Sequence, residues 1–147
     1  MAVTVYRWDD PYAPVLSNPS AGSLIDVLDA CLVNGYPGKS GAGWTKAFSG
    51  TNLAAYRQGA GSMCYLRVND GTGSFKATAR GYESMTDIDT GVNAFPTTAQ
   101  IANGVSAAIG ISTTPAKKPW IVVADNKRFY LWVGVSLTTT DDLSAST

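Results

Sequence analysis

Residues 23–34 read SLIDVLDACLVN, and this stretch gives the clearest structural pattern in the chain. Apolar residues recur three and four positions apart, which places them on one stripe of an α-helix. The members of the stripe are Leu24, Val27, Leu28, Cys31 and Leu32. Ser23 followed by Asp26 is a start of the capping-box type, and Asn34-Gly35 followed by Pro37 is a typical stop. The pattern predicts one amphipathic helix over 23–34 whose stripe faces the core.

The sequence on the C-terminal side of the helix predicts antiparallel strands joined by short turns. The expected strands are 44–48, 53–58, 63–69, 75–81, 120–124 and 128–135. Turn-forming residues join them in pairs, as SGTN at 49–52, DGTG at 70–73 and DNK at 125–127. We therefore predict an α+β domain with one amphipathic helix packed on a mainly antiparallel sheet that ends in a long hairpin at 120–135.

Between the strand pairs, residues 86–114 show a weaker pattern of Asp, Thr, Asn, Ala and Gly. We expect a long excursion here, with a short helical turn at 98–103 and an element of undecided type at 105–111. The two ends of the chain also lack a clear period. We predict an extended N-terminal arm at 1–18, a single domain at 19–135 and a polar C-terminal tail at 136–147 that lies on a surface or on a neighbouring subunit.

The composition is that of one globular domain and argues against several classes of function. The chain has 147 residues, of which 45% are apolar, and its 11 basic and 11 acidic residues give a net charge of zero. A neutral chain lacks the broad attraction to nucleic acid or anionic membrane that a basic one has. The absence of histidine removes the usual neutral-pH general base, the usual zinc ligand and Ser–His or Cys–His nucleophiles.

The N-terminus has no basic region followed by an apolar run, as a signal peptide would. The longest apolar stretches fall well short of the roughly 20 residues that a membrane-spanning helix needs. We expect a soluble protein that is not exported and that binds neither membrane nor nucleic acid directly.

Several short motifs resemble chemical sites only in part. Asp87–Gly91 is similar to the start of a calcium loop, but the third oxygen ligand and the closing Glu are missing. DGTGS at 70–74 is glycine-rich but has no phosphate-binding lysine, so we interpret it as a hairpin turn. The carboxylate pairs Asp9–Asp10 and Glu83–Asp87 have no identifiable apolar pocket that would raise the pKa of an acid. We predict no catalytic, cofactor-binding or metal-binding residue.

The two cysteines, Cys31 and Cys64, are too few for a disulfide framework and show no C-x-x-C spacing. We interpret both as buried free thiols, with a disulfide between them as the alternative.

A set of motifs spread over most of residues 5–133 resembles a family of virion structural proteins of tailed bacteriophages. The motifs are YRWDDP (6–11), AGSLIDVLDACLVNGY (21–36), GWTKAFSGTN (43–52), YRQG (56–59), YLRV (65–68), GYESM (81–85), DIDTG (87–91), FPT (95–97) and PWIVVAD (119–125). Similar proteins often continue past the last hairpin into further strand-rich sequence, whereas this chain has a Ser/Thr tail there. It is therefore either a short member or a fragment.

The resemblance implies a non-enzymatic particle component, made in the host bacterial cytoplasm and located in the virion. It would lie at the capsid surface, the head-to-tail neck or the tail, and would assemble as an oligomer with copies of itself and other virion proteins. No catalytic residues carry over. We expect the proline-broken N-terminal arm and the polar tail to make the contacts. The expected interface residues are Tyr6, Trp8, Asp9, Asp10, Tyr12, Val15 and Leu16.

The alternative function is a host-surface glycan-binding module that uses Trp and Tyr side chains. Exposed aromatic residues with Asp and Asn neighbours are how sugar sites are built, and aromatic residues make up 10% of the chain. Most of them are expected in the core, because aromatic residues are also enriched in strands.

Overall fold

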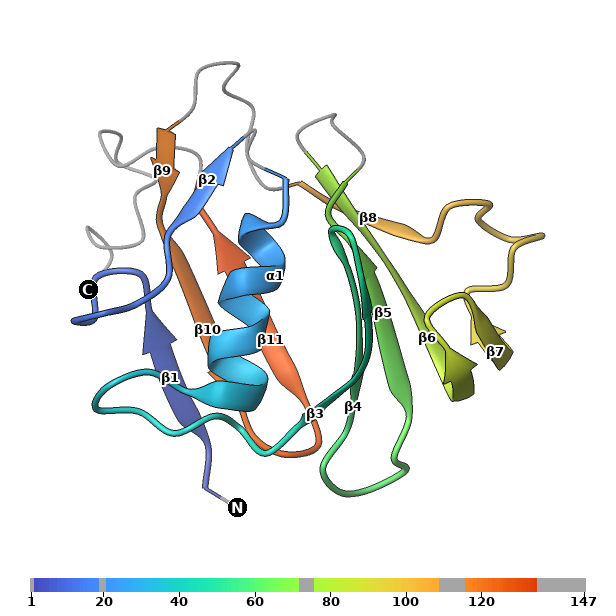
Figure 1. The fold of residues 1–147 in the computed structure, drawn as a ribbon, viewed down its shortest axis with the longest axis horizontal. Helices are drawn as coiled ribbons and strands as arrows, with labels where there is room; N and C mark the ends of the chain where they lie inside the picture. The colour runs from blue at the N-terminus through green and yellow to red at the C-terminus, as the bar shows by residue number, and fades with distance from the viewer. Residues whose placement is uncertain (1, 19–20, 72–75, 109–115, 135–147) are drawn as a thin grey trace.

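The fold is given by a computed structural model, which describes residues 2–18, 21–71, 76–108 and 116–134. Within these ranges the chain forms one short helix and antiparallel strands, which is the predicted α+β class (Figure 1). The predicted tail at 136–147 and the second half of the element expected at 105–111 lie outside the described residues.

The strands form three separate groups. They are β1 (Thr4–Arg7), β2 (Leu16–Asn18), β3 (Thr45–Gly50), β4 (Leu53–Arg57), β5 (Tyr65–Asn69), β6 (Lys76–Asp87), β7 (Thr90–Phe95), β8 (Val105–Ala108), β9 (Ala116–Lys118), β10 (Trp120–Ala124) and β11 (Phe129–Val133). A three-stranded sheet has the order β1-β10-β11, and β2 pairs with β9. The six-stranded sheet has the order β3-β4-β5-β6-β7, with β8 also beside β6. All these pairings are antiparallel.

The predicted helix is confirmed over its whole length, although its second half is wound differently. Residues Ser23–Leu28 form the α-helix α1, and Asp29–Asn34 continue it as the π-helical segment η1. The apolar stripe is buried as expected. The predicted stop is also confirmed, since Gly35 follows the helix with a left-handed φ of 71°.

The predicted capping box at the helix start is wrong, because the cap comes from a distant residue. Gly22 is the N-cap with φ 87° and offers no side chain, and the Ser23 hydroxyl instead donates to the carbonyl of Ser17 at 3.0 Å. The Leu24 amide donates to the Asp70 carboxylate at 2.9 Å. Burial raises the pKa of Asp70, while hydrogen bonds from backbone amides at the helix start oppose this rise. Asp70, the residue directly after β5, thus holds the start of the helix in place.

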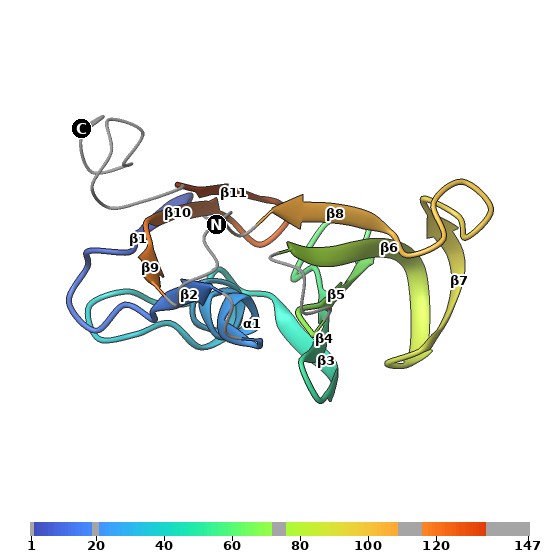
Figure 2. The same ribbon diagram turned by 90° about the horizontal axis from the view of Figure 1, so that it is seen from above.

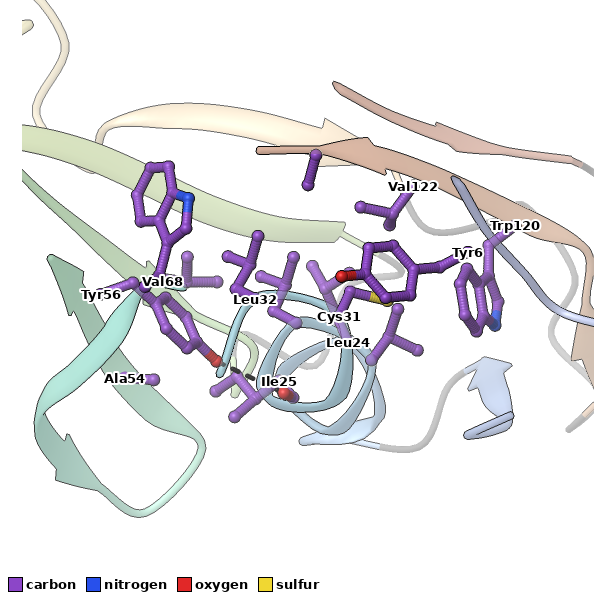
Figure 3. Packing of buried hydrophobic residues seen from close by; sticks show 14 of the residues in the cluster. Tyr6, Leu24, Ile25, Cys31, Leu32, Ala54, Tyr56, Val68, Trp120 and Val122 are labelled. Carbon is purple, nitrogen blue, oxygen red and sulfur yellow. Dashed lines mark hydrogen bonds between the residues drawn. The ribbon is translucent and has the colours of Figure 1, made fainter. Parts of the chain in front are cut away.

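The core lies around the helix, between the two larger sheets. Figure 2 shows α1 against one face of the β1-β10-β11 sheet, with β3 and β4 at its side. Trp120, Tyr6 and Tyr56 are fully buried there, and Figure 3 shows them arranged around the helix. The Tyr56 hydroxyl donates to the Asp29 carboxylate at 2.7 Å, which ties β4 to the helix. Burial, followed by this hydrogen bond, raises the pKa of Tyr56.

The described part of the region 86–114, residues 86–108, is more regular than predicted. The strand expected to end at residue 81 continues to Asp87 as β6, turns, and returns as β7. Further along, β8 pairs with the beginning of β6. The helical turn expected at 98–103 corresponds to a turn in which the Gln100 and Ile101 amides both donate to the Thr97 carbonyl. These strands escaped prediction because much of β7 is exposed, so apolar and polar residues do not alternate along it.

The hairpin of β10 and β11 forms as predicted, whereas the long hairpin expected at 120–135 is not shown over the described residues, which end at 134. Each of its strands has five residues, and the ladder closes at Gly134, whose amide donates to the Pro119 carbonyl at 2.8 Å. None of the helices in the described ranges has the length and apolar character needed to cross a membrane.

Candidate functional site

The N-terminal segment lies against the domain as two of its strands. β1 pairs with β10, and β2 pairs with β9. Tyr6 on β1 and Leu16 on β2 are buried in the core, and the Tyr6 hydroxyl donates to the Ser40 carbonyl at 2.6 Å. Their side chains are therefore committed to the fold of their own chain.

Asp10 is the centre of a polar network that fastens the segment to the loop after the helix. Its carboxylate accepts hydrogen bonds from the Arg7 amide at 2.9 Å, the Tyr36 hydroxyl at 2.6 Å and Lys39 Nζ at 2.7 Å. Burial alone would raise the pKa of Asp10, but these hydrogen bonds outweigh it and leave the pKa lowered. Asp9 forms a more exposed ion pair with Arg7 at 2.8 Å. Asp10 thus stabilises the fold.

Of the remaining predicted interface residues, Trp8 and Val15 line one small hollow together with Leu16. Tyr12 and Val15 are exposed, with 79% and 49% of their surface accessible. Trp8 is half-buried, and its indole Nε1 has no hydrogen-bond partner in the described part of the chain. The contact role of this segment stays a prediction that rests on Tyr12 and Val15.

A surface that the sequence reasoning missed lies on the side of the three-stranded sheet that faces away from the helix. Successive rows across this sheet are Val5, Val123 and Tyr130, then Arg7, Ile121 and Trp132. Val5, Tyr130 and Trp132 are about half exposed, and Val3 extends the apolar area beyond β1. The outer face is defined here by its apolar members, Val3, Val5, Ile121, Val123, Tyr130 and Trp132.

The outer face carries aromatic side chains and a shallow hollow. The rings of Tyr130 and Trp132 stack with their centroids 6.1 Å apart. Beside them is a hollow of about 200 Å³, lined by Val3, Val123, Ala124, Asp125, Arg128 and Tyr130. The signal was present in the sequence, because WIVVA and FYLWV are apolar at both odd and even positions. A strand with this pattern places apolar side chains on both faces of its sheet.

A second missed feature is a groove between the two larger sheets, with a volume of about 510 Å³. Leu66 on β5 and Ala79 and Gly81 on β6 contribute to its lining. The rest of its lining comes from Trp44, Gln58, Ser62, Cys64, Tyr65, Phe95, Pro96, Val105, Arg128 and Phe129. A volume of this size is within the range of ligand-binding clefts, and the lining is mostly apolar.

The shape of the groove depends on a glycine. A Cβ atom at Gly81 would lie 2.1 Å from the ring of Phe95, so that ring can lie across β6 only because position 81 has no side chain. Phe95 itself is 53% exposed.

Both cysteines are free thiols, as predicted. Cys31 is fully buried, and burial raises the pKa of its thiol well above the ordinary value. The prediction that Cys64 is buried is wrong. Cys64 is partly exposed and lines the groove, so the two thiols differ in access to reagents.

The acidic motif at 87–91 forms the turn of the β6–β7 hairpin. Asp87 Oδ1 accepts a hydrogen bond from the Asp89 amide at 2.8 Å, and Asp89 pairs with Arg67 at 2.7 Å. Glu83 accepts a hydrogen bond from Asn93 across the same hairpin. These carboxylates hold the turn and the strands together. Over the described ranges, no group of three or more Cys, Asp and Glu side chains is placed to hold a metal ion.

The residues therefore offer two apolar surfaces, the outer face and the groove, on a compact neutral domain. Comparisons of the chain with protein-family models, with curated proteins and with solved structures found no match in any of the three.

Proposed function

We propose that this protein is a non-enzymatic structural component of a tailed-phage virion, which joins neighbouring subunits through the outer face of its three-stranded sheet. The observation that carries the proposal is the row of exposed apolar side chains on that face, above all Tyr130 and Trp132. An exposed apolar patch of this kind is typical of a protein–protein contact, and aromatic side chains are enriched in such contacts. The phage setting rests on the sequence motifs.

The rest of the molecule is consistent with a subunit held by its neighbours. The N-terminal segment is fixed by the Asp10 network, which leaves Tyr12 and Val15 exposed at its bend. These two residues would add to the contact between subunits. The proposed location of the protein is the virion. Copies of this chain and other virion proteins are the proposed partners.

The test is incorporation of variant chains into particles. The double variant Tyr130→Ser/Trp132→Ser should be absent or strongly depleted in purified particles, as measured by mass spectrometry. Val92→Ser is the matched control, because Val92 is 55% exposed on β7, away from the outer face. It should be incorporated like the wild type. Particles that lack the wild-type protein would rule out the proposal.

A host-surface glycan-binding module is the second candidate, and one observation favours it. Trp132 is 49% exposed and stacks on Tyr130, and a stacked aromatic pair is a suitable platform for a sugar ring. Saturable binding to a glycan array that is lost in Trp132→Ala, together with normal incorporation of that variant, would favour this function over a purely structural one.

A further inference from the structure

A small polar pocket lies on the face of the six-stranded sheet that is opposite to the groove. Leu66 and Gly81 are cross-strand partners that line the groove, and the next pair along β5 and β6, Arg67 and Arg80, points the other way. The pocket has a volume of about 200 Å³. Its polar side chains are those of Arg67, Asn69, Thr78, Arg80, Tyr82 and Asn103.

Arg80 is held at the pocket by the chain between β7 and β8. β8 pairs with the first part of β6 and β7 with the rest, so Arg80 lies where the neighbouring strand changes (Figure 1). Its guanidinium donates to the Thr98 hydroxyl at 3.2 Å and to the carbonyls of Ile101 and Ala102, the second at 3.0 Å. These acceptors are neutral, so they fix the side chain without balancing its charge.

The pocket carries an unbalanced positive charge. Arg67 and Arg80 lie directly opposite each other on β5 and β6, where like charges repel. Arg67 has an acidic partner, because its Nη2 donates to the Asp89 carboxylate at 2.7 Å. Among the described residues, no acidic side chain pairs with Arg80, and the buried Nε of Arg80 has no hydrogen-bond partner. A partly buried cation without a counter-charge is costly, and a bound anion would relieve that cost.

The size and charge of the pocket restrict which anion it can take. Its volume is below the roughly 300–1,000 Å³ of clefts for drug-sized ligands, so it has room for one small molecule or one group of a larger molecule. A single unbalanced positive charge matches a carboxylate better than a phosphate monoester, which is close to doubly charged at neutral pH. Guanidinium groups also match the planar geometry of a carboxylate.

The rest of the lining suits a ligand that carries hydroxyl groups. Thr78 and Tyr82 contribute hydroxyls, and Asn69 and Asn103 contribute amides, all of which can both donate and accept hydrogen bonds. The aliphatic side chains of the lining are two alanines. An acid with a long apolar tail would therefore gain little from burial here, whereas an acid with hydroxyl groups finds several partners.

We propose that this pocket binds a small hydroxylated carboxylate of the sugar-acid class, with the carboxylate between Arg67 and Arg80 and the hydroxyl groups facing Thr78 and Asn103. The site is distinct from the surface of the proposed function, because the outer face belongs to the three-stranded sheet. Either a free sugar acid or a sugar-acid unit of a polysaccharide has this chemistry.

The experiment titrates the isotope-labelled full chain with galacturonate at constant ionic strength and follows the backbone amide and arginine Nε signals by NMR. Galactose serves as the matched ligand without the carboxylate, and acetate as the carboxylate without hydroxyl groups. Asn103→Asp places an acid in the pocket at nearly unchanged size. Its matched control is Asn126→Asp, which makes the same change in the turn between β10 and β11. Thr78→Val removes a hydroxyl and keeps the shape of the side chain. Circular dichroism checks that each variant is folded.

Galacturonate is expected to cause saturable shifts at residues 67–69, 78–82 and 101–103. Asn103→Asp should weaken binding about tenfold or more, because its carboxylate competes for the arginines. Thr78→Val should weaken binding about fivefold, which corresponds to one neutral hydrogen bond. Asn126→Asp should bind like the wild type. Tighter binding of oligogalacturonate than of galacturonate would identify a polysaccharide as the source of the sugar acid, and equal affinity would identify a free acid.

Four results would overturn the inference. The first is the absence of saturable shifts with galacturonate. Equal affinity for acetate would show a site for any small anion, and equal affinity for galactose would show that the arginines do not recognise a carboxylate. Unchanged affinity in Asn103→Asp would place the binding elsewhere. Each of these results leaves particle incorporation through Tyr130 and Trp132 untouched, so the two proposals fail separately.

Discussion

Around α1 the large apolar side chains are buried, whereas along β7, β8 and the loop between them several are exposed. Trp120, Tyr6, Tyr56 and Leu32 have almost no accessible surface in the first region. In the second region Val92, Phe95, Ile101 and Val105 are each between 44% and 55% exposed. The helix-centred region supplies the stability of the domain, and the β7–β8 region contributes surface to the groove. The comparison predicts that truncating an apolar side chain lowers the free energy of unfolding much more in the first region than in the second.

The largest loss in the free energy of unfolding is expected for substitution of Trp120. Its side chain is fully buried and its indole nitrogen donates to the Pro14 carbonyl at 3.1 Å. Trp120→Ala should lower the free energy of unfolding by about 3–5 kcal/mol, because it leaves a cavity and an unpaired carbonyl. Val92→Ala in the β7–β8 region should change it by less than about 0.5 kcal/mol. Urea unfolding followed by circular dichroism measures both, and equal costs would contradict the division into two regions.

The next effect concerns the helix cap, which joins α1 to the end of β5. Asp70→Ala leaves amides at the buried helix start without their acceptor and should cost about 1–3 kcal/mol. Asp26→Ala is the control, since Asp26 is the exposed acid that the sequence pattern placed in a capping box. It should cost at most about 0.5 kcal/mol. A larger loss of unfolding free energy for Asp26→Ala than for Asp70→Ala would show that the nearby Asp26, and not the distant Asp70, stabilises the helix start.

The smallest of the three losses in the free energy of unfolding is expected for substitution of Asp10, and this loss depends on pH. The pKa of Asp10 is lowered in the folded protein, so its ionised carboxylate contributes stability above its unfolded pKa, near 3.9. That contribution is lost as the pH falls through the lowered pKa. Asp10→Asn should therefore cost about 1 kcal/mol at pH 7 and progressively less below about pH 4.

Thermal unfolding across pH 3 to 7 tests this prediction, with Asp9→Asn as the control. Asp9 pairs with Arg7 near the surface, with 39% of its side chain accessible, so its substitution should cost only about 0.3 kcal/mol. A cost for Asp10→Asn that stays constant with pH would show that the carboxylate charge is not the stabilising group.

Much of the fold could be predicted because local patterns coincide with the tertiary structure. The helix at 23–34, its stop at Gly35 and the β10–β11 hairpin all carry their signals within a few residues. Asp70 could not be assigned to the helix cap, because 46 residues separate it from Leu24 and only the folded chain brings them together.

The two candidate surfaces differ in how far the sequence could reveal them. The outer face has a readable signal, in strands that are apolar at every position. The groove has none, because its lining comes from segments between Trp44 and Phe129 that are joined only by the packing of two sheets. The N-terminal interface prediction relied on prolines and missing periodicity, which do not reveal that Tyr6 and Leu16 pair into strands of the domain.

The ring of Phe95 lying over Gly81 also constrains how the sequence of this protein can vary. Any residue larger than glycine at position 81 must displace that ring, so a change there costs least when position 95 takes a smaller side chain at the same time. Substitutions at positions 81 and 95 would then be correlated among related sequences. Each paired exchange would alter the width of the groove, and with it the size of the group that the groove can hold.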